Sequence, residues 1–349
     1  MFRLPAKPRF SDVARALARA APALMPACRA LLAPTLVGLS CIFLLAQDTP
    51  VIRVNVNLVH ILATVKTTKG ELVGSLGKDD FEVYDNGVKQ EIAHFQRQTD
   101  QPLSVALMID VSGSTAKDLG LEMDSATKFL HALLAEGRPD DRVALYSFDD
   151  TVRVEQPYSH NFTLLTNALR KIHGSAGTSL YDAITLVSQD LERRQGRKVM
   201  VVVSDGGETT SRYTSHDALK ALQMADAVIY PVVVLPVMSD SGRNTGGENF
   251  FKWIAPGTGG RAFFPQLSSE LDRTFSQIID DLRTQYSIGF YPHNVPLTKD
   301  PWHKLEVIEK SGKLQVSARN GYYGESETYS AASKGTSVDG DIRTKKKKE

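Results

Sequence analysis

The stretch VALMIDVSGST, residues 105–115, begins with apolar residues and ends with an acid and two serines. The apolar run already starts at Leu103, and its length is typical of a strand that is buried on both faces of a parallel sheet. Residues 118–137 follow with apolar side chains at helical spacing and end at a glycine, which predicts a helix. A buried strand followed by a helix is the repeating unit of an α/β fold.

The same alternation continues over residues 102–284. A helical pattern recurs in SLYDAITLVSQDLERRQG, residues 179–196, and a second buried strand in RKVMVVVSDGG, residues 197–207. Parallel strands need crossover connections, and helices usually supply them. The sequence therefore predicts an α/β domain with a doubly wound, mostly parallel, Rossmann-like sheet flanked by helices.

The segments on either side of this region have a different pattern. Residues 51–98 alternate apolar and polar side chains, and the pair Asn86-Gly87 between alternating residues is a strong hairpin signal. Residues 286–324 again read as strands, with no helix between them. We therefore expect an additional antiparallel, β-sandwich-like domain built from both flanks, with the α/β region inserted into it.

Both ends of the chain differ in composition from the rest. Residues 1–47 combine a basic leader with an uncharged apolar run, which predicts a secretory signal cut after Ala46. An uncleaved anchor, which would associate the protein with the membrane, is the alternative. Residues 325–349 are rich in Ser, Gly and Lys, which predicts a disordered basic tail. We expect an extracytoplasmic protein that is secreted, periplasmic or membrane-anchored.

Composition limits the classes of ligand. The formal net charge is +1 at pH 7, so the chain carries no large field of one sign that would attract nucleic acid. Export from the cytoplasm also removes ATP and most nucleotides from the expected ligands, but it leaves divalent cations. Both cysteines, Cys28 and Cys41, lie in the leader, so the exported part must fold without disulfides.

Three polar clusters stand next to predicted elements: two come directly after buried strands, and one comes directly before a helix. Ligands of open parallel sheets bind at the carboxyl ends of the strands, where we expect these clusters to meet. The first follows the strand of the opening stretch, the second (GSAGTS) opens a helix, and the third (SDGGE) follows a buried strand. Their candidate ligands are Asp110, Ser112, Ser114, Thr178 and Asp205.

All of these donors are oxygen atoms. Hard cations, above all Mg²⁺, take oxygen ligands, with Mn²⁺ or Ca²⁺ as alternatives, whereas zinc favours His or Cys. With only two carboxylates in the site, the ion keeps an open position. An Asp or Glu side chain from a partner protein could fill that position.

Helix capping and catalysis are alternative roles for these side chains. The hydroxyl groups of Ser112, Ser114 and Thr178 could cap helices instead of binding a metal. An Asp directly after a buried strand can also be the nucleophile of a Mg²⁺-dependent phosphohydrolase, but such enzymes carry a second Asp where Ser112 stands here. No nucleophile elbow occurs in the sequence either, so we predict no catalytic residue. A structural role in the cell envelope is a further alternative.

The motifs DVSGS, GTS and SDG, in this order and context, resemble the von Willebrand factor type A domain and its metal-ion-dependent adhesion site. The resemblance covers roughly residues 102–284. It implies that the first Asp and both serines hold the metal, that the Thr joins when a ligand is bound, and that the second Asp binds directly or through water. These roles correspond to Asp110, Ser112, Ser114, Thr178 and Asp205.

The flanking motifs DDFEVYDNGVKQEI and YSIGFYP resemble a group of secreted bacterial proteins, abundant in acidobacteria, that are related to this domain. Together the two resemblances imply an intact adhesion site. They predict an extracytoplasmic, Mg²⁺-dependent module for protein binding and cell adhesion, not an enzyme.

Overall fold

The computed structural model describes residues 58–97, 101–113, 119–174, 177–234, 245–267 and 270–324. All of them belong to the unit Val54–Glu349. The predicted leader, the predicted tail and Ser114 lie outside the described residues. No helix in the described ranges is long and apolar enough to cross a membrane.

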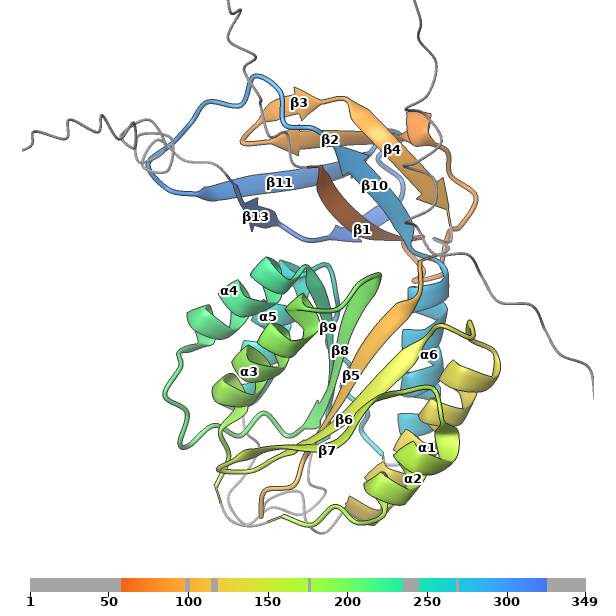
Figure 1. The fold of residues 1–349 in the computed structure, drawn as a ribbon. Coiled ribbons are helices and arrows are strands. Elements are labelled where there is room, and N and C mark those ends of the chain that lie inside the picture. Colours follow the sequence, from red (N-terminus) through yellow and green to blue (C-terminus); the bar gives the residue numbers. More distant parts are fainter. Residues whose placement is uncertain are drawn as a thin grey trace, which may run out of the picture. The chain divides into compact units, whose positions relative to one another are not determined.

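A five-stranded sheet forms the centre of the α/β part (Figure 1). Its order is β7-β6-β5-β8-β9, in which β5 pairs in parallel with β6 and β8, and β8 with β9. The edge strand β7 is antiparallel to β6. The bounds are β5 Leu103–Asp110, β6 Arg142–Phe148, β7 Val152–Ser159, β8 Arg197–Ser204 and β9 Ala227–Val233.

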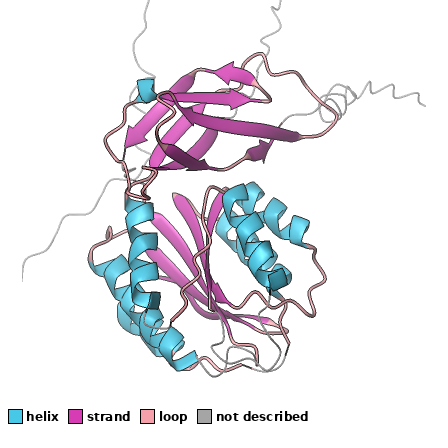
Figure 2. Cartoon of the chain, turned by 180° about the vertical axis from the view of Figure 1, so that it is seen from behind, coloured by secondary structure: helices cyan, strands magenta, loops and turns pink. Residues whose placement is uncertain are grey.

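Helices cover both faces of this sheet (Figure 2). Alternate residues of β5 explain why: Val105, Leu107 and Ile109 pack in one hydrophobic cluster, and Ala106 and Met108 pack in the other. Helices α1, α2 and α6 contribute to the first cluster, and α3, α4 and α5 to the second. Their bounds are α1 Leu119–Ala135, α2 Phe162–Leu169, α3 Leu180–Glu192, α4 Ser215–Ala225, α5 Thr245–Gly257 and α6 Leu271–Arg283.

The two flanks form a pair of antiparallel, four-stranded sheets with the orders β12-β1-β10-β4 and β13-β11-β2-β3. Each sheet mixes strands from before and after the α/β part, because β1 pairs with β10 and β2 with β11. Side chains from both sheets share one hydrophobic cluster. The bounds are β1 Val59–Lys66, β2 Phe81–Asp85, β3 Val88–Gln90, β4 Ile92–Arg97, β10 Tyr286–Phe290, β11 Trp302–Glu309, β12 Gln315–Ala318 and β13 Gly321–Tyr323, with a 3-10 turn at Lys78–Asp80.

The predicted fold class is confirmed in both parts. The α/β region has a mostly parallel sheet between helices, and the flanks supply the antiparallel sheets. The predicted hairpin joins β2 to β3, with Asn86 at φ 47° and Gly87 at φ 80°. Two successive positive φ angles match the right-handed twist of a tight hairpin, which is why Asn-Gly is favoured there.

Candidate metal site

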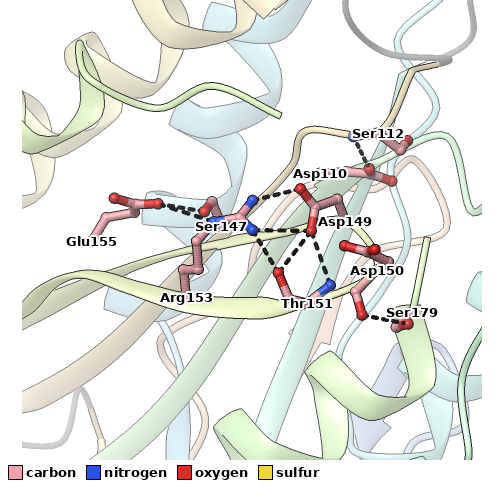
Figure 3. Close-up of polar contacts among 9 residues, drawn as sticks. All are labelled: Asp110, Ser112, Ser147, Asp149, Asp150, Thr151, Arg153, Glu155 and Ser179. Carbon is pink, nitrogen blue, oxygen red and sulfur yellow. Dashed lines mark hydrogen bonds and ion pairs between the residues drawn. The ribbon is translucent and has the colours of Figure 1, made fainter. Parts of the chain in front are cut away.

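Asp110 ends the central strand β5 and is fully buried. One carboxylate oxygen, Oδ1, accepts a hydrogen bond of 2.9 Å from the backbone N–H of Ser112 (Figure 3). The other, Oδ2, accepts one of 2.6 Å from the hydroxyl of Ser204 at the end of β8. The first and third polar clusters are therefore joined through Asp110.

Ser204 has a part in the site that the sequence did not reveal. Its hydroxyl donates to Asp110 and accepts from the backbone N–H of Gly206 at 2.9 Å, so it also holds the turn that carries Asp205. The signal that could have identified it is strand register. Ile109 pairs with Val203, which places the next residues of the two parallel strands, Asp110 and Ser204, side by side.

The side-chain oxygens of Thr178 and Asp205 both lie close to Gly207. The N–H of Gly207 donates to Asp205 Oδ1 at 2.8 Å. A methyl group added to Gly207 would stand 3.0 Å from that oxygen and 3.6 Å from Thr178 Oγ1, so both oxygens line the same small space. The backbone of Thr178 is also bonded to Thr209: its N–H donates to the Thr209 hydroxyl at 2.9 Å, and its carbonyl accepts from the Thr209 N–H at 2.8 Å.

The backbone at Gly174, in the segment before α3, packs against Val111, the residue that follows Asp110. A Cβ atom on Gly174 would lie 1.6 Å from the carbonyl oxygen of Val111, so only glycine permits this approach. Four of the five predicted ligands, Asp110, Ser112, Thr178 and Asp205, thus come from segments that meet at the carboxyl edge of the sheet; Ser114 is the fifth.

The electrostatics of this edge fit a cation. Burial raises the pKa of Asp110 to about 6, and the charge of Asp205 acts in the same direction, against the hydrogen bonds from Ser204 and Ser112. A cation beside Asp110 would favour the ionised form of its carboxylate. No group of three His, Cys, Asp or Glu side chains in the described ranges is arranged for metal binding. The oxygen atoms that meet at this edge come from two carboxylates and from hydroxyls, and a hard cation would suit such a set.

A neighbouring acid, Asp149, has a structural role. Asp149 closes the turn between β6 and β7, where its Oδ1 accepts from the Thr151 N–H at 2.9 Å and its Oδ2 from Arg153 at 2.6 Å (Figure 3). Burial opposes ionisation, but these hydrogen bonds prevail and lower the pKa of Asp149.

The alternative role of Thr178 as a helix cap is wrong. The N-cap of α3 is Ser179, whose hydroxyl donates to the Asp150 carbonyl at 3.2 Å.

Gly206 should tolerate no side chain, because it combines a φ of 79° with close backbone contact. A Cβ atom there would lie 2.7 Å from Gly247 Cα. We expect Gly206→Ala to lower the free energy of unfolding by about 3 kcal/mol, from left-handed strain and overpacking together.

Urea unfolding of the full chain measures this loss. Gly70→Ala is the control, because Gly70 has a similar φ of 87° and no atom within 4 Å of its would-be Cβ. It should cost only about 1 kcal/mol. Equal losses in the two variants would show that the contact with Gly247 is unimportant.

The chain is similar to known proteins in part of its sequence and in its structure. Residues 105–208 match the family model described as the von Willebrand factor type A domain. No curated protein matches the chain. Similar solved structures include an aerotolerance-related membrane protein from Bacteroides fragilis NCTC 9343 with multiple mutations to serines, at 17% identity over 52% of this chain and 98% of that one, with a TM-score of 0.42.

Two further similar structures are the vWF domain of the type V pili tip protein Mfa5 from Porphyromonas gingivalis and a von Willebrand factor type A protein from Catenulispora acidiphila. The first is 14% identical over 52% of this chain and 95% of that one, with a TM-score of 0.43. The second is 11% identical over 72% and 75%, with a TM-score of 0.42. The resemblance to the von Willebrand factor type A domain is confirmed for residues 105–208, which hold all five predicted site positions.

Proposed function

We propose that this chain is an extracytoplasmic module for protein binding that works through a divalent cation at the carboxyl edge of its parallel sheet. The observation that carries the proposal is the meeting of Asp110, Ser112, Thr178 and Asp205 at that edge, with the pKa of the buried Asp110 raised to about 6. Ser114, on the segment that continues from Ser112, is proposed as the fifth ligand.

These five residues would hold Mg²⁺, or Mn²⁺ or Ca²⁺ in its place, through oxygen atoms alone. Once bound, the ion would supply a positive centre that accepts the carboxylate of an Asp or Glu from a partner protein. The surrounding chain keeps the ligands in place: Ser204 orients Asp110, and the N–H of Gly207 orients Asp205.

The proposed role is binding and adhesion rather than catalysis. A phosphohydrolase that used Asp110 as its nucleophile would need an acid two residues later, and that residue is Ser112. We also propose that the apolar segment near the N-terminus directs or anchors the protein outside the cytoplasm. The likeness of the flanking motifs to secreted bacterial proteins of this type supports the same placement.

Cation binding is the first test. Calorimetric titration of Mg²⁺ or Mn²⁺ into the full chain is expected to show one site. Asp205→Asn should weaken binding there by at least about tenfold, because it removes one of the two negative charges of the proposed site. The matched control is Asp140→Asn. It removes the same charge from an exposed turn before β6, at the opposite edge of the sheet. Equal affinities in the two variants would reject the site.

The partner is tested by capture from membranes of the native organism with Mg²⁺ or with EDTA. A contact through the ion should be lost with EDTA and in Asp205→Asn, and it should persist in Asp140→Asn. Capture that is indifferent to EDTA would favour the structural role in the envelope, in which the β sheets make the main contacts.

A further inference from the structure

We propose that Asp182, Glu208 and Ser211 are positioning residues that set the spacing between Thr178 and Asp205 and so tune the affinity of the site for its cation. We call these three residues the clasp. This inference rests on the proposed function, and it assigns a role to side chains that do not themselves hold the ion. It follows from how the helix α3 begins.

Helix α3 is capped by a loop far away in the sequence. The first N–H groups of any helix lack partners within it, and the N-cap side chain usually supplies one. Here the N-cap Ser179 makes no such bond. Instead the hydroxyl of Ser211 accepts from the N–H groups of Tyr181 and Asp182, both at 3.1 Å, and Glu208 Oε2 accepts from the Tyr181 N–H at 3.0 Å.

The connection also runs in the opposite direction. Asp182, in the first turn of α3, uses its Oδ1 to accept hydrogen bonds from the backbone N–H groups of Arg212 at 2.8 Å and Tyr213 at 2.9 Å. Each segment therefore presents a carboxylate to the backbone of the other. Because the bonds are reciprocal, the loop after β8 cannot move away from α3 without breaking several of them together.

Glu208 has no capacity left to bind a cation. Its Oε1 accepts from the N–H groups of Thr210 at 3.0 Å and Ser211 at 2.8 Å. Its Oε2 accepts from the Tyr181 N–H and, at 2.7 Å, from the Ser211 hydroxyl. Four donors use the roughly four lone-pair positions of a carboxylate. An acid at this place in an adhesion-type loop could be mistaken for a ligand, but its hydrogen bonds make it structural support.

The clasp lies close in sequence to the proposed ligands in both segments, α3 and the loop after β8. Thr178 is two residues before the first residue of α3, and Asp205 is three residues before Glu208. Any change in the spacing of α3 and this loop therefore changes the distance between the Thr178 hydroxyl and the Asp205 carboxylate. Residues that support metal ligands in this way typically change metal affinity about 10- to 100-fold when they are mutated.

Ser211 allows a test without any change of charge. In the full chain, Ser211→Ala removes the hydroxyl that accepts from the first N–H groups of α3 and donates to Glu208. We expect the Kd for Mg²⁺ or Mn²⁺ to rise about tenfold. Ser211→Thr restores a hydroxyl and should restore the affinity. Hydrogen exchange of the Tyr181 and Asp182 amides, measured without cation, should be faster in the Ala variant than in the wild type or the Thr variant.

Thr214→Ala separates positioning from a general loss of helix capping. Thr214 caps α4 through its hydroxyl, which accepts from the Asp217 N–H at 3.2 Å, and it makes no bond to α3 in the described structure. Its loss should destabilise the protein without changing the Kd for the cation. Equal Kd values for wild type and Ser211→Ala would overturn the positioning role while leaving the proposed function intact. A wild-type chain that binds neither cation would overturn both.

Discussion

Replacing Asp110 by asparagine is expected to abolish the response of the protein to Mg²⁺ and Mn²⁺ while leaving the cation-free protein folded. Asparagine has the same shape and can keep the hydrogen bonds of Asp110 with the Ser112 backbone and the Ser204 hydroxyl. Its oxygen can accept from the Ser112 N–H, and its amide can donate to the Ser204 hydroxyl, which has a free acceptor position. What the variant loses is the negative charge, and with it one of the two carboxylates of the site.

Thermal unfolding with and without cation measures this effect. At a cation concentration of about 100 times Kd, the wild type should gain about 2.7 kcal/mol of stability, because only the folded state binds. Asp110→Asn should gain none, whereas Asp140→Asn should gain as much as the wild type. A cation-induced gain that persists in Asp110→Asn would place the bound ion elsewhere in the chain.

The second large effect is a pH dependence of the cation-free protein. Burial raises the pKa of Asp110 from 3.8 to about 6, so the folded state binds this proton more tightly than the unfolded state. The contribution of Asp110 to stability is therefore fully present below about pH 4 and is lost as the pH rises through 6. A rise of the pKa from 3.8 to about 6 corresponds to about 3 kcal/mol.

Urea unfolding of the wild type and Asp110→Asn in EDTA, from pH 4 to pH 7.5, isolates this contribution, since other groups titrate in both proteins. Asp110→Asn should become more stable than the wild type by up to about 3 kcal/mol as the pH rises. Mg²⁺ at about 1,000 times Kd, which adds about 4.1 kcal/mol to the wild type, should reverse the order at pH 7. Parallel pH profiles in EDTA would contradict the assignment of a buried carboxylate with a raised pKa.

The fold could be predicted well because its signals are local. The apolar run that ends at Asp110 is long enough only for a strand that is buried on both faces, and β5 has helices on each side. The Asn86-Gly87 turn and the alternation in the flanks specify antiparallel strands in the same way. The antiparallel direction of β7 follows from the short turn at Asp149, which leaves no room for a crossover helix.

The candidate site could be predicted only in part, because several of its contacts depend on the fold. The sequence alone could identify Asp110, Thr178 and Asp205 as candidates, because each stands beside the end of a strongly patterned strand or helix. The hydrogen bond from Ser204 to Asp110 depends on the register between β5 and β8, which no local pattern reveals. The capping of α3 by Glu208 depends on two segments 27 residues apart in the chain.

The most direct test of the central claim is the anomalous difference density of crystals of the full chain grown with Mn²⁺. We predict one peak at the carboxyl edge of the sheet, in the space bordered by Asp110, Ser112, Thr178 and Asp205, with ligand oxygens at about 2 Å from the ion. One position of the ion should be held by water or by a carboxylate from another molecule. The absence of a peak at this edge, or a peak surrounded by other residues, would contradict the account.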